Sequence, residues 1–116
     1  MSTDRDLLIA CYNAFNRRDI ETALAAMHPL VEWPNGMEGG YVHGHSALRD
    51  YWTRQWTMID PHVEPRSFAS DEDGRTIVDV HQVIRDLGGT IVTERTVQHV
   101  YRIEQGLVRH MEIREP

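Results

Sequence analysis

Towards the end of the chain, over residues 90–114, apolar and polar side chains alternate. Val97 and Tyr101 fall on one side of this pattern together with His99. A period of two residues is typical of a β-strand, and the Gly-containing segment 104–106 predicts a tight turn between two such strands. A polar side chain on an otherwise apolar row needs a partner or a ligand, so His99 is a first indication of a pocket.

Three earlier segments have the period of amphipathic helices. The first is predicted to begin after Thr3, which is spaced for a capping box with an acidic residue, and to extend to Arg17. Asp19 is the expected N-cap of a short second helix, which must end before Pro29 because the residue preceding proline disfavours the helical conformation. Ser46 is the expected N-cap of the third, which extends to about residue 60.

Strand-like segments alternate with turn formers in the rest of the chain. They predict strands at residues 30–33, 62–70 and 76–86. Pro65 lacks a ladder donor and indicates an edge strand or a bulge. Residues 37–44, with three glycines, are expected to form a loop, and Gly88-Gly89 a two-residue hairpin turn. The pattern predicts an α+β fold in which three helices pack on one face of a curved antiparallel sheet.

The composition excludes several classes of protein. With 116 residues the chain is long enough for one core, so 1–116 is expected to be a single domain. A net charge of −6 disfavours a nucleic-acid surface, and no apolar run reaches the roughly 18 residues that span a membrane. The first residues do not have the pattern of a secretory signal. Cys11 is the only cysteine, which favours a reducing, cytoplasmic location, and its helical spacing favours a core position over a nucleophile.

Four segments together are similar to one superfamily of small domains. The segments are NRRDIETALAAMHP, VEWPNG, VHGHSALRDYW and the terminal hairpin HVYRIEQGLVRHMEI. They resemble the nuclear transport factor 2-like superfamily, and most closely its SnoaL-like polyketide cyclase and ketosteroid isomerase branch. The likeness covers almost the whole chain. It implies a cone-shaped barrel with a hydrophobic pocket and a homodimer. It leaves the activity open, because isomerases, dehydratases, epoxide hydrolases, cyclases and non-catalytic binders share this fold.

Compared residue by residue, the resemblance argues against ketosteroid isomerisation. The isomerase has its aspartate base in a VEDP segment, and this chain has Trp33 in that place. Cys11, with Tyr12 beside it, occupies the position of the oxyanion-donating tyrosine. His99 occupies that of the oxyanion-donating aspartic acid. Since all three side chains differ, a reaction in this pocket would not be that of the standard isomerase.

The hairpin turn determines which residues share a face of the sheet. With a turn at Gly88-Gly89, position 82 lies opposite 95, 80 opposite 97 and 78 opposite 99. The face towards the helices then carries Val78, Val80, Gln82, Ile84, Arg95, Val97, His99, Tyr101, Met111 and Ile113. A slip of one residue would exchange the faces and place His81, rather than His99, inside.

His99 is the main candidate for chemistry, with Tyr101 two positions along, because an imidazole can act as an acid or base near neutral pH. The alternative is a core histidine satisfied by one hydrogen bond. Arg95 with Gln82 could anchor a carboxylate or carbonyl, unless Arg95 only pairs with a neighbouring carboxylate. Aromatic residues at helical spacing serve equally as core or as pocket wall. The expected ligand contacts are Tyr12, Phe15, Trp33, Trp52, Trp56, Gln82, Arg95, Val97 and Met111.

His43 and His45 have no obvious third ligand nearby, so neither a metal nor a cofactor is expected. Three functions stay open: an enzyme of the isomerase, cyclase, lyase or hydrolase type using acid–base chemistry, a binding module, and a dimerisation domain. The expected ligand is a small apolar, cyclic metabolite. We expect no nucleic acid or membrane partner. The outer face, where Val100 alternates with Gln98 and Arg102, is expected to form a homodimer.

Overall fold

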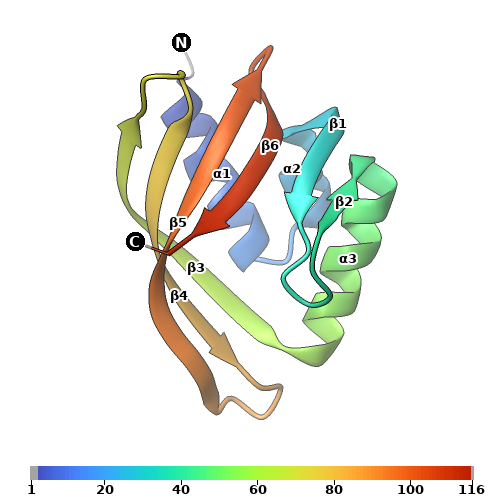
Figure 1. Cartoon of the computed structure of the whole chain (residues 1–116). Helices are drawn as coiled ribbons and strands as arrows, with labels where there is room; N and C mark the ends of the chain where they lie inside the picture. Colours follow the sequence, from blue (N-terminus) through green and yellow to red (C-terminus); the bar gives the residue numbers. More distant parts are fainter. Residues whose placement is uncertain (1–2, 116) are drawn as a thin grey trace.

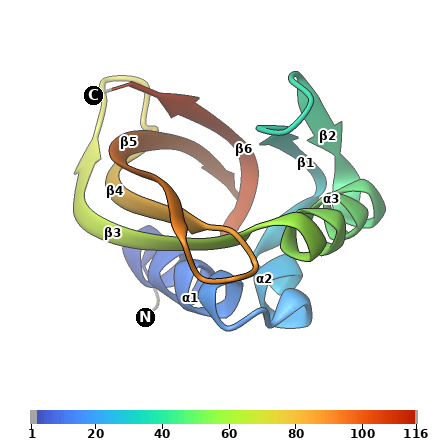
Figure 2. The same cartoon turned by 90° about the horizontal axis from the view of Figure 1, so that it is seen from below.

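The computed structural model describes residues 3–115, which form three helices and one six-stranded sheet. In chain order the elements are α1 (Asp4–Asn16), α2 (Ile20–Ala25), β1 (Met27–Pro34), β2 (Tyr41–His43), α3 (Gly44–Met58), β3 (Asp60–Ser70), β4 (Thr76–Arg85), β5 (Ile91–Glu104) and β6 (Leu107–Arg114). The strand order is β2-β1-β6-β5-β4-β3, and the sheet is strongly curved (Figure 1). Helix α1 packs beside β3 and α3 beside β1, so the helices lie along the open side of the curve (Figure 2). The predicted α+β cone is confirmed.

The first two helices begin where their capping residues predict. The Thr3 hydroxyl accepts from the Asp6 amide while the Asp6 carboxylate accepts from the Thr3 amide, which completes a capping box. Asp19 accepts from the Thr22 amide at the start of α2. The third expectation was wrong. Helix α3 begins at Gly44, and Ser46 is not its cap, because the chain turns into the helix at Gly44 with a φ of +82°.

Residues 37–44 were expected to form a loop. This is only partly right, because β2 lies within them. The Asn35 side chain accepts from the amides of Met37 and Glu38, and the Asn35 amide donates to the Gly40 carbonyl. This tight turn reverses the chain. Tyr41–His43 consequently pairs antiparallel with β1, and the glycine-rich segment forms a short hairpin.

Strands β4 and β5 have the predicted register, although their turn differs from the prediction. Gln82 lies opposite Arg95, and Val78 opposite His99. The connection is not the expected two-residue turn, since the Asp86 amide donates to the Thr90 carbonyl and leaves three residues between them. An irregularity beyond Arg85 then restores the register. His99 therefore faces the helices, and His81 faces outward.

Two further features concern the edges and direction of the strands. Strand β3 is an edge strand whose pairing shifts at Pro65, as that proline predicts. The sheet is mixed rather than wholly antiparallel, because β1 pairs parallel with β6. In the chain these two strands are separated by α3 and four other strands, which leaves room for a parallel connection.

The core lies between the helices and the concave face, and the opposite face is polar. Val100 on that outer face is only 1% exposed. Around it, Arg75 pairs with Glu112 at 3.3 Å, and Gln98 donates to Asp79 at 3.0 Å. The outer face consequently presents mainly polar groups. Within residues 3–115 no helix is long and apolar enough to cross a membrane.

Candidate functional site

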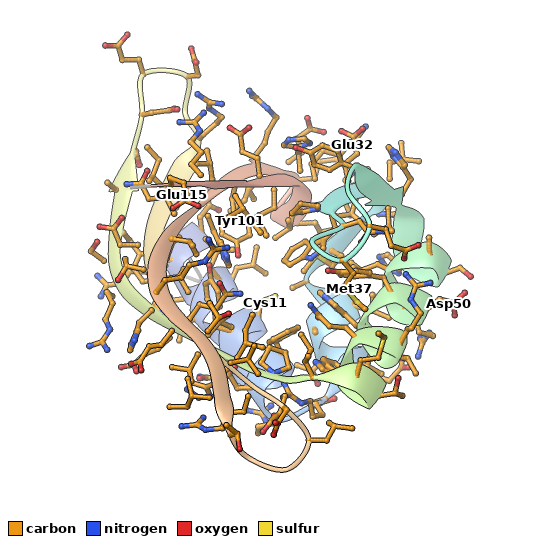
Figure 3. All side chains as sticks on the ribbon, turned by 60° about the horizontal axis from the view of Figure 1, so that its bottom comes forward. Cys11, Glu32, Met37, Asp50, Tyr101 and Glu115 are labelled. Carbon is orange, nitrogen blue, oxygen red and sulfur yellow. The ribbon has the colours of Figure 1, made fainter. Side chains whose placement is uncertain are left out.

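A cavity of about 200 Å³ lies inside the cone. Cys11 of α1, Met37 of the β1–β2 turn and Tyr101 of β5 come from three sides of it (Figure 3). The predicted contact residues that line the cavity are Tyr12, Phe15, Trp33, Trp52, Gln82, Arg95, His99, Tyr101 and Met111. The fold therefore brings together, around one cavity, side chains from both halves of the chain.

Two predicted contact residues do not line this cavity. Val97 is fully buried among core residues. Trp56 lies behind the wall, where its ring packs against Phe15 with centroids 5.4 Å apart and carries the Arg18 guanidinium 5.2 Å above it. Gln55, the residue before it on α3, reaches the cavity instead.

The apolar wall is a set of aromatic rings in edge-to-face or tilted contact. Trp52 is 1% exposed, and its ring centroid lies 5.3 Å from that of Trp33 and 5.8 Å from that of Phe15. Trp33 in turn lies 6.4 Å from Tyr101. These separations are typical of favourable aromatic pairs. Trp52 is consequently both a core residue and part of the cavity wall.

At the floor of the cavity three polar side chains form a hydrogen-bonded chain. The Tyr101 hydroxyl donates to the Tyr12 hydroxyl at 2.8 Å, and the Tyr12 oxygen lies 2.8 Å from Nδ1 of His99. All three residues are buried, with His99 5% exposed. With Tyr101 donating to Tyr12, we assign the Tyr12 proton to the bond with Nδ1, which makes Nδ1 the acceptor.

This direction determines the protonation of the imidazole. Burial lowers the pKa of His99 to about 4, so the ring is neutral at pH 7 and its single proton lies on Nε2. Burial also raises the pKa of Tyr12 and, well above its ordinary value, that of Tyr101. All three groups are consequently neutral, and the hydrogen-bonded series from Tyr101 through Tyr12 to His99 ends in the Nε2–H donor.

The Nε2 atom of His99 is open to the cavity. It makes no hydrogen bond within the described residues. Within residues 3–115 the indole nitrogen of Trp56 is the one buried side-chain polar atom that lacks a hydrogen-bond partner. Nε2 of His99 also lacks a partner among these residues, so it must be accessible from the cavity. The sequence indicated the inward histidine. It did not indicate that Tyr12 on α1 would satisfy the other ring nitrogen.

The mouth of the cavity carries Arg95 and Gln82, which face each other on β5 and β4. Arg95 Nη1 lies 3.2 Å from Glu115, so the expected alternative of an ion pair is present while Arg95 still lines the cavity. His81 on the outer face lies 3.0 Å from Glu94. Arg95 is thus the positively charged side chain at the mouth of the cavity.

Several lining residues were not among the predicted contacts. Cys11, assigned to the core, also reaches the cavity, but burial raises the pKa of its thiol to about 12, which disfavours a thiolate nucleophile. Tyr51 lies next to Trp52 on α3, and its hydroxyl accepts from the Gly36 amide at 3.0 Å. This bond fixes the β1–β2 turn against the helix, and its only signal in the sequence was a second aromatic residue beside Trp52.

The alternating histidines of β2 and α3 have separate roles. His45 Nε2 bonds the Met27 carbonyl at 2.8 Å, and His43 lies 3.6 Å from Glu32 on the outer side. In the part of the chain that the structure describes, no group of three His, Cys, Asp or Glu residues is arranged to hold a metal ion.

Comparison with solved structures gives relatives over the whole fold. TerC, crystallised with polyporic acid, is 30% identical, with 99% of this chain and 92% of that chain covered and a TM-score of 0.84. An NTF2-like protein of unknown function from Burkholderia pseudomallei is 28% identical, with 100% and 92% covered and a TM-score of 0.84. An LEH-like epoxide hydrolase from M. tuberculosis is 17% identical, with 92% and 77% covered and a TM-score of 0.76, which shows the shared fold alone.

The sequence itself gives the family. No curated protein matches it. The family model of the SnoaL-like domain matches residues 8–111, from within α1 to within β6, which include nearly all of the residues that line the cavity. The chain belongs to the SnoaL-like domain family and has its NTF2-like fold.

Proposed function

We propose that this protein, as one domain over residues 1–116, binds a small, largely apolar cyclic compound with an oxygen facing His99. The observation that carries the proposal is the unpaired Nε2–H at the floor of an aromatic-walled cavity. Because this N–H is open to the cavity, a bound carbonyl or hydroxyl oxygen can accept its hydrogen bond. The crystal of TerC with polyporic acid supports a small-molecule site in this family.

Acid–base chemistry without a cofactor, of the isomerase, cyclase or lyase type, is the second candidate. The chain from Tyr101 through Tyr12 to His99 favours it, because proton shifts along the chain would strengthen the bond from Nε2 to a developing oxyanion. Complete transfer would leave a buried phenolate on Tyr101, whose pKa is raised well above its usual range. No carboxylate belongs to the lining of the cavity in residues 3–115. Polarisation of a bound oxygen is therefore the stronger role, and ligand binding is our conclusion.

Quenching of tryptophan fluorescence tests the proposal, since Trp33 and Trp52 line the cavity. We expect cyclic ketones to bind the parent protein. His99→Phe keeps a planar ring but removes the donor, so it should weaken binding roughly tenfold, in line with the loss of one hydrogen bond to the ligand. His99→Gln is the matched variant, because its amide nitrogen can replace Nε2. The proposal is wrong if His99→Phe binds every ketone as tightly as the parent.

A homodimer through the outer face of the sheet is the second part of the proposal. The helices of the described chain lie on the other side, so this face is uncovered in one copy (Figure 2). Its polar composition predicts a hydrogen-bonded interface. We expect a dimer mass in light scattering at micromolar concentration and a monomer for Arg102→Glu, which reverses an exposed charge on this face. Asp50→Arg, on the far side of α3 (Figure 3), should remain dimeric. A monomer mass for the parent protein would contradict the dimer.

A further inference from the structure

We infer that the ligand is an anion with one ring inside the cavity, an acceptor oxygen directed to His99 and an acidic oxygen directed to Arg95. This inference rests on the proposed function and adds the charge and the size of the ligand.

The charge follows from the lining of the cavity. Arg95 is its one permanently charged side chain among the described residues, and neither aspartate nor glutamate lines it. Its other polar side chains include Gln55, Gln82, Tyr51 and His99, which are neutral donors or acceptors at neutral pH. A cation entering this space would lose hydration without gaining a counter-charge, whereas an anion would gain one. The negative charge of the whole chain, −6, therefore does not describe its cavity.

The present partner of Arg95 can be displaced. Glu115 Oε1 lies 3.2 Å from Arg95 Nη1, and the two side chains are 75% and 51% exposed. Ion pairs at that exposure contribute little to stability, so a ligand carboxylate held on its other side by the cavity can replace Glu115. Gln82 lies opposite Arg95, and its side-chain amide makes no hydrogen bond within residues 3–115, so this amide is free to bind the same group.

The positions of the two polar ends define the length of the ligand. Arg95 and His99 share a face of β5 four residues apart, or about 13 Å between their Cα atoms in an extended strand. Both side chains line the cavity, and a ring with polar substituents at opposite ends, together with the hydrogen bond at each end, spans a gap of this order. The volume agrees, because an apolar cavity of about 150 Å³ accommodates benzene. A cavity of about 200 Å³ has room for one ring with small substituents, not for several fused rings.

Three isosteric probes separate charge from the acceptor oxygen. 4-Acetylbenzoate has both features, 4-acetylbenzamide lacks the charge, and 4-isopropylbenzoate lacks the acceptor. By calorimetry at pH 7.5 we expect 4-acetylbenzoate to bind the parent roughly three- to tenfold more tightly than 4-acetylbenzamide, the effect of one charge-assisted contact at a half-exposed site. Arg95→Gln should remove this preference. Glu115→Gln should increase affinity for the benzoate and leave that for the benzamide unchanged.

The acceptor is tested in the same series. 4-Isopropylbenzoate should bind more weakly than 4-acetylbenzoate to the parent, and equally to His99→Phe. If the benzamide binds the parent as tightly as the benzoate, the ligand is not an anion and the inference is wrong, although weaker ketone binding by His99→Phe would still support the proposed function. If none of the three probes binds while larger cyclic ketones quench the fluorescence, the single-ring size is wrong and the proposed function stands.

Discussion

Replacing Trp52 with alanine is expected to lower the free energy of unfolding by about 3–5 kcal/mol, the usual cost of removing a buried aromatic side chain. Trp52 is 1% exposed and contacts Trp33 and Phe15, which come from two other elements. A domain of this size has a total stability of about 5–15 kcal/mol, so the variant should be close to unfolding. Urea denaturation followed by circular dichroism measures the change.

Trp56→Ala is the matched control. The same residue type is removed four positions along α3, from a partly exposed site outside the cavity. Its loss should be clearly smaller, because solvent already reaches part of the ring and the remaining space opens to water. Equal losses for the two variants, or a loss below about 1 kcal/mol for Trp52→Ala, would show that Trp52 is not the central packing residue of the cone.

The sequence predicted the sheet more accurately than the turns that join its strands. The alternation of side chains along residues 90–114 placed His99 on the inner face of the sheet. A strand has only two faces, and the apolar row had to face the helices. The turn at Gly88-Gly89 was wrong by one residue, yet the register was correct, since the irregularity beyond Arg85 compensates for it. Burial of a whole row of side chains outweighs the preference of one turn.

The arrangement of the site depended on contacts that no local pattern contains. Tyr12 and His99 are 87 positions apart, and their bond depends on how α1 docks against β5. The helical periodicity predicted that Tyr12 faces inward. It does not fix the rotation of α1 about its axis precisely enough to predict which residue Tyr12 bonds. The same limit explains Trp56, because one helical stripe contains both Gln55 and Trp56. The parallel pairing of β1 with β6 likewise depends on contacts between distant parts of the chain.

Burial of His99 is expected to make the protein about 3 kcal/mol less stable at pH 4 than at pH 7. The pKa of its imidazole is lowered from 6.5 to about 4 in the folded state. Above pH 6.5 the ring is neutral in both states and has no effect. As the pH falls from 6.5 to 4, the unfolded chain binds a proton that the folded protein does not, which favours unfolding. A difference of this size corresponds to about 3 kcal/mol.

His99→Phe isolates this contribution. Tyr12, Tyr101 and Cys11 face the imidazole and have raised pKa values, so they stay neutral across this range. The carboxylates and the six other histidines are the same in both proteins, so their effects cancel in the difference. Urea denaturation at half-unit steps from pH 7 to 4 should therefore show the parent losing about 3 kcal/mol relative to His99→Phe. Parallel stability curves would mean that His99 takes up its proton in the folded protein, and that the neutral chain ending in Nε2–H does not persist below pH 6.5.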